Sequence, residues 1–230
     1  MLIILCLLFC ISILSPLIYK LLKNATHLFI SFLVLVIFVI FISTFGNLPP
    51  DGYTDSISII NELSINLTFY LDGLGFFFSV IVLCIGTIVI FYSGTYMKDK
   101  KNSGRYYLFI MLFLTSMLGL VTSGNLITIF IFWEFTSITS FFLIGFDNEN
   151  PDARKAANKA LLVTAGGGLA LLAGFILIYI SAGTFNIPEL FAKRESIIFG
   201  DNYFLILIFI SLGCFTKSAQ MPFHFWLPDA

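Results

Sequence analysis

The stretch LITIFIFWEFTSITSFFLIGF, from Leu126 to Phe146, is apolar over the length of a membrane-crossing helix except for one acidic residue, Glu134. A run of about 20 apolar residues spans the hydrocarbon core of a bilayer as an α-helix. A charge at the centre of such a helix costs roughly 3 kcal/mol on insertion scales, so it usually faces a bundle interior or a wet cavity. The stretch therefore predicts a membrane helix that carries a functional carboxyl group.

The composition of the whole chain also indicates a membrane protein. The 230 residues are 59% hydrophobic and only 11% charged, and a soluble domain of this size could not bury so much apolar surface. The net charge of −1 and the lack of a basic cluster with interleaved aromatic residues argue against nucleic acid as a partner. The four cysteines lie in apolar runs without a CxxC pair, which predicts small buried hydrophobic residues.

Seven apolar runs are predicted to cross the membrane, so the expected fold is an all-α membrane protein. The first run ends in Lys20 and Lys23 rather than in a cleavage site, which favours a retained helix over a signal peptide. A short turn of loop-forming residues, 122–125, separates the fourth run from the fifth. The predicted runs are Ile3–Tyr19, Leu28–Phe45, Leu74–Met97, Tyr106–Val121, Leu126–Phe146, Ala160–Ile180 and Tyr203 to about Gln220.

The basic residues predict the orientation of these helices. The opposite side carries only Lys193 and Arg194, whereas the loops after the first, third and fifth runs carry nine basic residues: Lys20, Lys23, Lys98, Lys100, Lys101, Arg105, Arg154, Lys155 and Lys159. The positive-inside rule places those nine in the cytoplasm and the N-terminus outside. The segment Gly46 to Asn66 is then an external loop, in which LPPDG predicts a turn.

The seventh run is short and interrupted. The 15 residues from Tyr203 to Lys217 make about 22 Å of helix, against a hydrocarbon core of about 30 Å. Pro222 and Pro228 follow with apolar residues between them, so the chain stays in or near the membrane while its helix is broken. Transporters use such broken helices as ion sites. Lys217 is either part of an ion path or a surface lysine whose stem snorkels outward.

Other polar residues near these two charges have open interpretations. For Glu134 itself, the alternatives to an ion path are a neutral buried acid or a static ion pair. Lys159 either extends the path or anchors the topology. Gly166 to Gly168 predict close helix packing or a local bulge, since no Lys-Ser/Thr follows as in a phosphate loop. Four hydroxyls either line a wet face or bond to their own helix: Thr136, Ser137, Thr139 and Ser140.

Four strings closely resemble the large A subunit of Mrp-type multisubunit Na+/H+ antiporters: FYLDGLG, GNLITIFIFWEFTSITSFFLIGF, KALLVTAGGGLALLAGF and GCFTKSAQMPFHFWLPDA. They resemble less closely the antiporter-like chain 5 of respiratory complex I and subunits of membrane-bound hydrogenases. The resemblance covers about Leu67 to Ala230. Within one membrane domain, 1–230, it implies two first helices with a loop (1–65), an N-terminal antiporter-like segment (66–122) and the start of a proton-conducting domain (123–230).

Carried over by position, the resemblance implies that Glu134 of WEFTS and Lys217 of TKSAQ form the central pair of a proton half-channel. His224 matches a position implicated in ion passage, and its alternative is an interfacial histidine hydrogen-bonded in a loop. Asp72 is either the N-cap of the third helix or an ion ligand. The A subunits of the family are several times longer, so a fragment or a separately encoded piece is expected.

The expected function is a proton-translocating, non-enzymatic subunit of a Na+/proton antiporter in a bacterial cell membrane. The expected partners are other subunits of the complex, the lipid bilayer and the transported ions H+ and Na+, with no cofactor. A proton that neutralises Glu134 would deprive Lys217 of its partner charge and so favour proton release to the next site. Two alternatives stay open: a proton-pumping subunit of an NADH:quinone oxidoreductase or a hydrogenase, and a non-conducting fragment. The chain itself lacks the cysteine spacing of iron–sulfur clusters.

Overall fold

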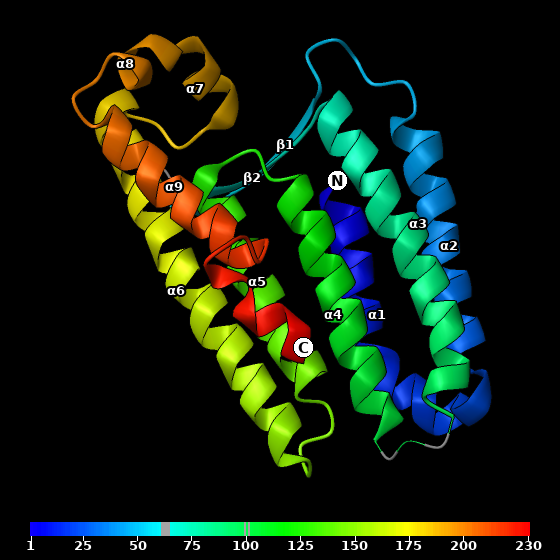
Figure 1. The fold of residues 1–230 in the computed structure, drawn as a ribbon. Coiled ribbons are helices and arrows are strands. Elements are labelled where there is room, and N and C mark those ends of the chain that lie inside the picture. The colour runs from blue at the N-terminus through cyan, green and yellow to red at the C-terminus, as the bar shows by residue number, and fades with distance from the viewer. Residues whose placement is uncertain (61–64, 99, 101) are drawn as a thin grey trace. The chain divides into compact units, whose positions relative to one another are not determined.

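The computed structural model describes residues 1–60, 65–98, 100 and 102–230, and it is mainly helical, as predicted (Figure 1). The chain forms two compact units. Unit 1 comprises Met1–Asp55 and Phe69–Ser123, and unit 2 comprises Ser56–Thr68 and Gly124–Ala230.

Unit 1 contains four long helices: α1 (Leu2–Leu22), α2 (Thr26–Phe45), α3 (Gly73–Tyr96) and α4 (Ser103–Val121). A single 3-10 turn, η1 (Lys23–Ala25), joins α1 to α2. α1 packs along α4, α2 packs along α3, and α3 also touches α4 (Figure 1). The centre of unit 1 is built from fully buried apolar side chains that include Leu8, Phe41, Leu83, Met111 and Leu118.

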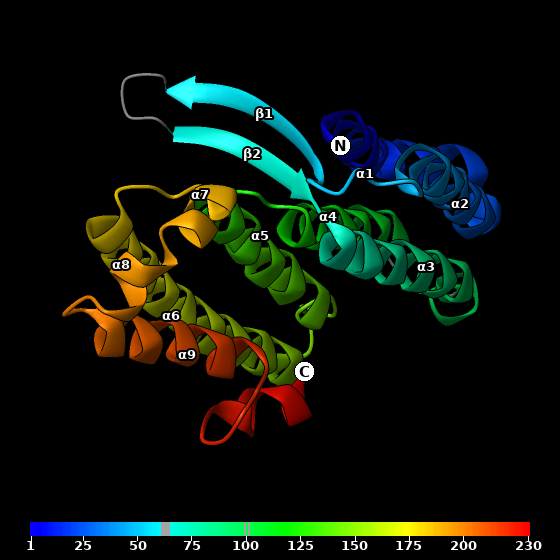
Figure 2. The same ribbon diagram turned by 90° about the horizontal axis from the view of Figure 1, so that it is seen from above.

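Unit 2 is organised around α6 (Pro151–Ala182), whose 32 residues make a helix of about 48 Å. Seen from above, α6 runs beside both α5 (Leu126–Ile144) and α9 (Tyr203–Lys217) (Figure 2). The short helices α7 (Ile187–Ala192) and α8 (Arg194–Ile198) lie between α6 and α9 in sequence, and a 3-10 helix, η3 (Phe223–Asp229), follows α9. One apolar cluster holds these elements together: Leu126, Leu171, Phe175, Ile178 and Ile206.

The predicted turn between the fourth and fifth runs is confirmed. α4 ends at Val121 and α5 begins at Leu126, because the side chain of Asn125 accepts a hydrogen bond of 2.8 Å from the Ile127 N–H and so caps α5. α6 begins nine residues before the predicted start at Ala160. Asn150 caps this helix, and proline in its first turn needs no hydrogen-bonding N–H there.

The segment Gly46 to Asn66, predicted as a loop, is different in the structure. β1 (Tyr53–Ile60) and β2 (Ile65–Leu71) form a two-stranded sheet, and their arrows run in opposite directions in Figure 2. Both strands are rich in β-branched and aromatic residues, which favour strands. The turn predicted from LPPDG is confirmed by a hydrogen bond of 2.9 Å from the Gly52 N–H to the Pro49 carbonyl.

Within the part of the chain that the structure describes, five segments are long and apolar enough to cross a membrane. The first of them, Leu2–Phe45, contains both α1 and α2, and the 15-residue α9 is shorter than the others. The number of crossings and the predicted orientation stay predictions. The cysteines were expected to be buried, but Cys6, Cys10 and Cys214 are exposed. They lie on outer faces of apolar helices, where lipid rather than a protein core would cover them.

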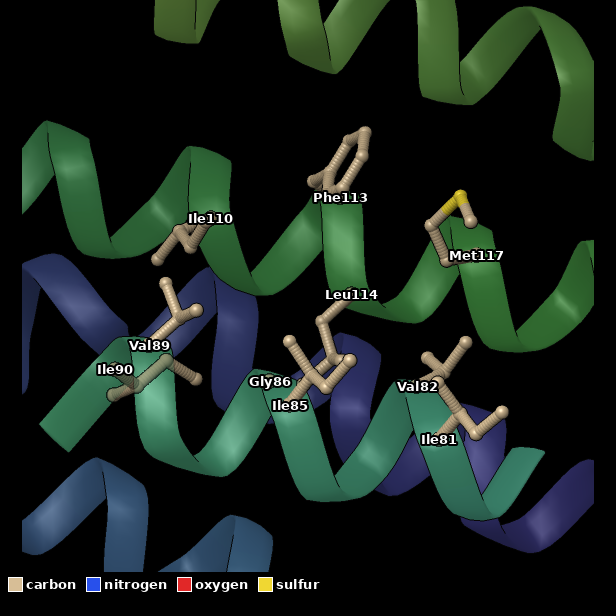
Figure 3. A pocket seen from close by; sticks show the side chains of 10 residues that line it. All are labelled: Ile81, Val82, Ile85, Gly86, Val89, Ile90, Ile110, Phe113, Leu114 and Met117. Carbon is tan, nitrogen blue, oxygen red and sulfur yellow. The ribbon is translucent and has the colours of Figure 1, made fainter. Parts of the chain in front are cut away.

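An apolar cavity of about 280 Å³ lies in unit 1 between α3 and α4 (Figure 3). Its described lining consists of α3 residues from Ile81 to Ile90 and α4 residues from Ile110 to Met117, all apolar. Such a lining offers no group that could bind an ion. The charged residues of interest lie in unit 2.

Candidate functional site

Glu134 and Lys217 lie in the same unit, on two helices that both flank α6. Glu134 is in the middle of α5, and Lys217 is the last residue of α9. Both side chains are half-buried. The structure therefore brings the two residues that were predicted as a pair into one neighbourhood.

The ammonium group of Lys217 points toward α5. It donates a hydrogen bond of 2.7 Å to the Ser137 hydroxyl and one of 3.3 Å to the Trp133 carbonyl oxygen. It also lies 5.5 Å from the centroid of the Trp133 ring, a distance at which a cation is attracted to the aromatic face. Trp133 and Ser137 are four residues apart and so share one face of α5. The alternative in which Lys217 snorkels to the surface is therefore not the arrangement found.

The carboxyl group of Glu134 is held differently. Its Oε1 atom is buried and has no protein hydrogen-bond partner among the residues described. The same is true of the indole Nε1 of the adjacent Trp133. Buried polar atoms are nearly always hydrogen-bonded, and an exception is a reason to look for a role in proton or ion chemistry.

Glu134 and Lys217 do not form a direct ion pair in the structure. Among the described residues, the ion pairs join other groups. The two charges nevertheless lie close enough to interact electrostatically. The lysine thus binds a hydroxyl and a carbonyl on the helix of Glu134, rather than its carboxylate.

The glycine triplet of α6 makes room for both helices. A Cβ atom on Gly168 would overlap the Glu134 Oε1 atom, and a Cβ on Gly167 would overlap the Thr216 hydroxyl of α9. Gly166 has nothing within 4 Å of that position. Close packing, one of the two interpretations of the triplet, is therefore confirmed. The Glu134 carboxyl group contacts α6 at Gly168.

α9 ends at Lys217, three residues before the predicted end at about Gln220. The Gln220 N–H bonds the Phe215 carbonyl at 2.9 Å, and the Ala219 N–H bonds the Thr216 carbonyl at 3.4 Å. Ala219 has a positive φ of 51°. This is the Schellman arrangement, with alanine at the left-handed position that glycine usually occupies. The indole N–H of Trp226 donates to the same Thr216 carbonyl at 3.0 Å and so attaches η3 to the helix end.

The other predicted residues are less closely connected to this cluster. His224 lies exposed on η3. Lys159 of α6 forms an ion pair with Asp229 of η3. Asp72 belongs to unit 1, where its side chain accepts a hydrogen bond of 2.7 Å from the Gly75 N–H and caps α3. A role of these three residues in an ion path stays a prediction.

The hydroxyls that follow Glu134 bond to their own helix, which was one of the two interpretations. The donors are Thr136, Ser137, Thr139 and Ser140. Ser137 does more, since it also accepts from Lys217. The sequence alone does not assign this hydroxyl to the lysine. The available signal was its spacing of three residues from Glu134, which puts both on one side of α5.

Two family models match this chain. Residues 123–230 match the family described as NADH:quinone oxidoreductase/Mrp antiporter, TM. Residues 57–107 match the family described as NADH-Ubiquinone oxidoreductase (complex I), chain 5 N-terminus. The first match contains Glu134, Lys217 and the glycine triplet.

Curated relatives match nearly the whole chain. It is 38% identical over 225 residues to the A subunit of the Na(+)/H(+) antiporter of Alkalihalophilus pseudofirmus, with 96% of this chain and 28% of that protein covered. It is 37% identical over 223 residues to the A1 subunit of the Na(+)/H(+) antiporter of Staphylococcus haemolyticus, with 95% and 28% covered. The chain therefore spans little more than a quarter of the length of these relatives.

Solved structures show the same fold. A chain of the Mrp complex from Dietzia sp. DQ12-45-1b superposes with a TM-score of 0.86 at 33% identity, over 99% of this chain and 24% of that one. A chain of an archaeal membrane-bound sulfane sulfur reductase superposes with a TM-score of 0.77 at 22% identity, over 95% and 35%. Residues 57–107 and 123–230 thus match models of the antiporter-like membrane subunits that complex I and the Mrp antiporters share, and the chain is similar to part of the A subunit of Na(+)/H(+) antiporters.

Proposed function

We propose that this chain is a proton-translocating part of a cation/proton antiporter subunit, and that Glu134 and Lys217 pass protons along its path. The observation that carries the proposal is the position of the Lys217 ammonium, bound to Ser137 and the Trp133 carbonyl on the helix that bears Glu134. Burying two ionisable groups among apolar helices is costly, so such groups in membrane proteins usually serve a function. Residues 123–230, which hold both groups, would form the start of the conducting domain.

The arrangement supports a two-position mechanism for the lysine. In one position its ammonium rests on Ser137 and Trp133, which are neutral acceptors. In the other it would move to the Glu134 carboxylate and form the ion pair. A proton arriving at Glu134 would remove the attraction, and desolvation would then favour proton release from Lys217. Because the two groups titrate as a coupled pair, a charge that arrives at one end can drive a proton out at the other.

The buried Oε1 of Glu134 supports the same role. It has no protein donor among the described residues, so a carboxylate would need a water molecule as donor, whereas protonation would remove the charge whose burial is costly. Because Gly168 has no side chain, this oxygen can lie directly against α6. Protonation and hydration can therefore change at this atom without rearranging a hydrogen-bond network of the protein.

The ions and partners are proposed from the relatives. The curated relatives are named as subunits of Na(+)/H(+) antiporters, and one solved relative is part of an Mrp complex. We therefore propose Na+ and H+ as the transported ions, other membrane subunits as partners, and a bacterial cell membrane as the location. Proton uptake would drive Na+ export.

The test is Na+-dependent proton flux in membrane vesicles that contain the whole complex. Glu134→Gln keeps the size of the side chain but cannot exchange a proton, so flux should fall to the background of vesicles without the complex. Glu195→Gln, an exposed change on α8, is the matched control and should leave flux unchanged. Flux at the wild-type level in assembled Glu134→Gln complex would refute the proposal.

A second candidate is a proton-pumping subunit of a respiratory enzyme, because the family model for residues 57–107 describes chain 5 of complex I. Purifying the chain with its natural partners separates the two candidates. Small membrane subunits without redox centres favour the antiporter. Co-purified flavin and iron–sulfur subunits favour the enzyme, in which Glu134 and Lys217 would serve the same proton path.

A further inference from the structure

A polar pocket of about 290 Å³ lies at one end of unit 1, whereas the residues of the proposed proton path belong to unit 2. Five elements meet there: the C-terminal end of α1, η1, the start of α2, the end of α3 and the start of α4. Its floor contains Met97, Ser103 and Tyr107, which are buried, and its rim contains Lys23 and Lys98, which are exposed. The pocket is therefore a cavity with a basic entrance.

The charge around this pocket is strongly positive. The described residues of 19–27 and 94–107 include five Lys and Arg and no Asp or Glu, whereas the whole chain has a net charge of −1. Lys23 and Lys98 come from different loops, and the fold brings them to one cavity. Lys23 also has a positive φ of 46°, an uncommon conformation for a side chain of this size. Such a site attracts an anion.

His27 and Gly94 shape the inner wall of the pocket. A Cβ atom on Gly94 would overlap the His27 ring, so glycine lets the imidazole lie directly against α3. On another side of the cavity, the rings of Tyr19 and Tyr107 lie 6.2 Å apart. Tyrosines with buried rings are typical of the membrane–water boundary, where headgroups lie. The pocket therefore offers hydroxyl, imidazole and ammonium groups at headgroup level.

A separate apolar groove lies next to the pocket, between α2 and α3. It has a volume of about 340 Å³, and its described lining includes Leu28, Phe32 and Leu35 of α2 and Ile88 and Phe91 of α3. These five side chains are between 44% and 60% exposed. The rings of His27 and Phe91 lie 6.3 Å apart, so the lining of the pocket meets the lining of the groove at this pair of residues.

We propose that this pocket and groove bind one anionic phospholipid, with its phosphate between Lys23 and Lys98 and an acyl chain in the groove. Basic pockets at the ends of membrane helices recognise anionic headgroups, and the positive-inside rule predicts this end of unit 1 to face the anionic cytoplasmic leaflet. A free phosphate would use the basic pocket but would gain nothing from the groove. The position of the apolar groove directly beside the basic pocket therefore favours a lipid.

The first test measures lipid retention by the full-length protein in detergent, by native mass spectrometry against phosphatidylglycerol, phosphatidylcholine and inorganic phosphate. The double variant Lys23→Gln/Lys98→Gln should bind phosphatidylglycerol about thirtyfold more weakly, since each lysine near an anionic lipid contributes about fivefold. Arg154→Gln/Lys155→Gln removes two exposed charges outside the pocket and should bind it like wild type.

The outcomes separate the sources of the phosphate. Preference for phosphatidylglycerol over phosphatidylcholine that is lost only in the pocket variant supports the proposal. Equal losses in both double variants would mean general attraction to charge and would overturn it. Displacement of the lipid by inorganic phosphate at similar concentrations would also overturn it, because the groove would then contribute nothing.

The second test locates the acyl chain. The chain has only two tryptophans, Trp133 and Trp226, both in unit 2, so Phe91→Trp adds a fluorophore in the groove and Phe77→Trp adds one elsewhere on α3. Phosphatidylglycerol with brominated acyl chains should quench the added emission of Phe91→Trp more strongly than brominated phosphatidylcholine does. Equal quenching by the two lipids at Phe91→Trp, as expected at Phe77→Trp for bulk lipid, would contradict the proposal.

Discussion

The Nζ atom of Lys217 lies 2.7 Å from the hydroxyl oxygen of Ser137, one helical turn beyond Glu134 on α5. The lysine is thus fixed beside the carboxyl group without being paired to it. A direct ion pair would be a deep electrostatic minimum in an apolar interior and would resist changes of protonation. A lysine held by a hydroxyl and a carbonyl can exchange partners at a lower cost, which suits a group that must repeatedly gain and lose a proton.

Replacing Ser137 with alanine tests this placement. Hydrogen bonds to charged groups contribute about 1.5–3 kcal/mol, so the loss of this acceptor should lower Na+-dependent proton flux at least about tenfold. Ser140→Ala is the matched control, because the Ser140 hydroxyl bonds only to the Ser137 carbonyl among the described residues. If flux falls equally in both variants, a change in helix α5 would be the cause, and not the loss of the hydrogen bond to Lys217.

Gly168→Ala tests whether the Glu134 carboxyl group must rest against α6. The added Cβ would overlap its Oε1 atom, so the carboxyl group must move or the helices must separate, at a cost of about 1–3 kcal/mol in the free energy of unfolding. Proton flux should fall as well.

Gly166→Ala is the control for that change. No atom lies within 4 Å of the added Cβ, and alanine in a helix interior is about 0.5–1 kcal/mol more stable than glycine. This variant should keep wild-type flux and unfold at a slightly higher temperature in detergent. Loss of flux in Gly166→Ala to the level of Gly168→Ala would contradict the assignment of the carboxyl contact to Gly168.

Much of this helix framework could be predicted from the sequence. The apolar runs predict the long helices, and the loop-forming residues at 122–125 predict the turn between α4 and α5. Pro222 predicts that the last helix is interrupted, although α9 ends at Lys217, before the predicted end at about Gln220. β1 and β2 were missed because the segment between two apolar runs was assigned by default to a loop. Its β-branched and aromatic residues were the available signal.

The details of the site were harder to predict. Composition and position identify Glu134 and Lys217 as unusual, but they cannot say which acceptor the lysine finds. That choice depends on how α9 is rotated against α5, which the glycines of α6 determine by close approach. Long-range packing of this kind leaves no local pattern in the sequence, so the contacts of Ser137 and Gly168 could not be predicted from it.

Ala219→Gly should stabilise the end of α9. Alanine in the left-handed conformation costs about 1–2 kcal/mol relative to its preferred conformations, whereas glycine adopts it readily. The free energy of unfolding in detergent should rise by about 1 kcal/mol. Ser218→Gly, at a residue with a negative φ of −86°, should lower it instead. A lower stability of Ala219→Gly would argue against the Schellman geometry.

Glu189 at the start of α7 predicts a pH dependence outside the membrane helices. Hydrogen bonds from the side chains of Thr184 and Asn186, the second at 3.2 Å, lower the pKa of the Glu189 carboxyl group. A lowered pKa in the folded state stabilises the protein above the ordinary pKa of glutamate, and this contribution is lost as the pH falls through the lowered value.

Thermal unfolding from neutral to acidic pH checks this prediction. Glu189→Gln should melt at a lower temperature than wild type at pH 7, and the difference should shrink toward zero in acid. The effect should be small because the carboxyl group is exposed. A melting difference that stays constant down to acidic pH would show that the carboxylate charge is not its cause.

The most direct test of the central claim is infrared difference spectroscopy of the assembled complex in lipid, recorded as Na+ and pH are switched. A Glu134 that exchanges a proton during transport predicts a carbonyl-stretch band of a protonated carboxyl group that appears and disappears with the switch in wild type and is missing in Glu134→Gln. The same band in both proteins, at the same intensity, would contradict the claim that Glu134 carries the proton.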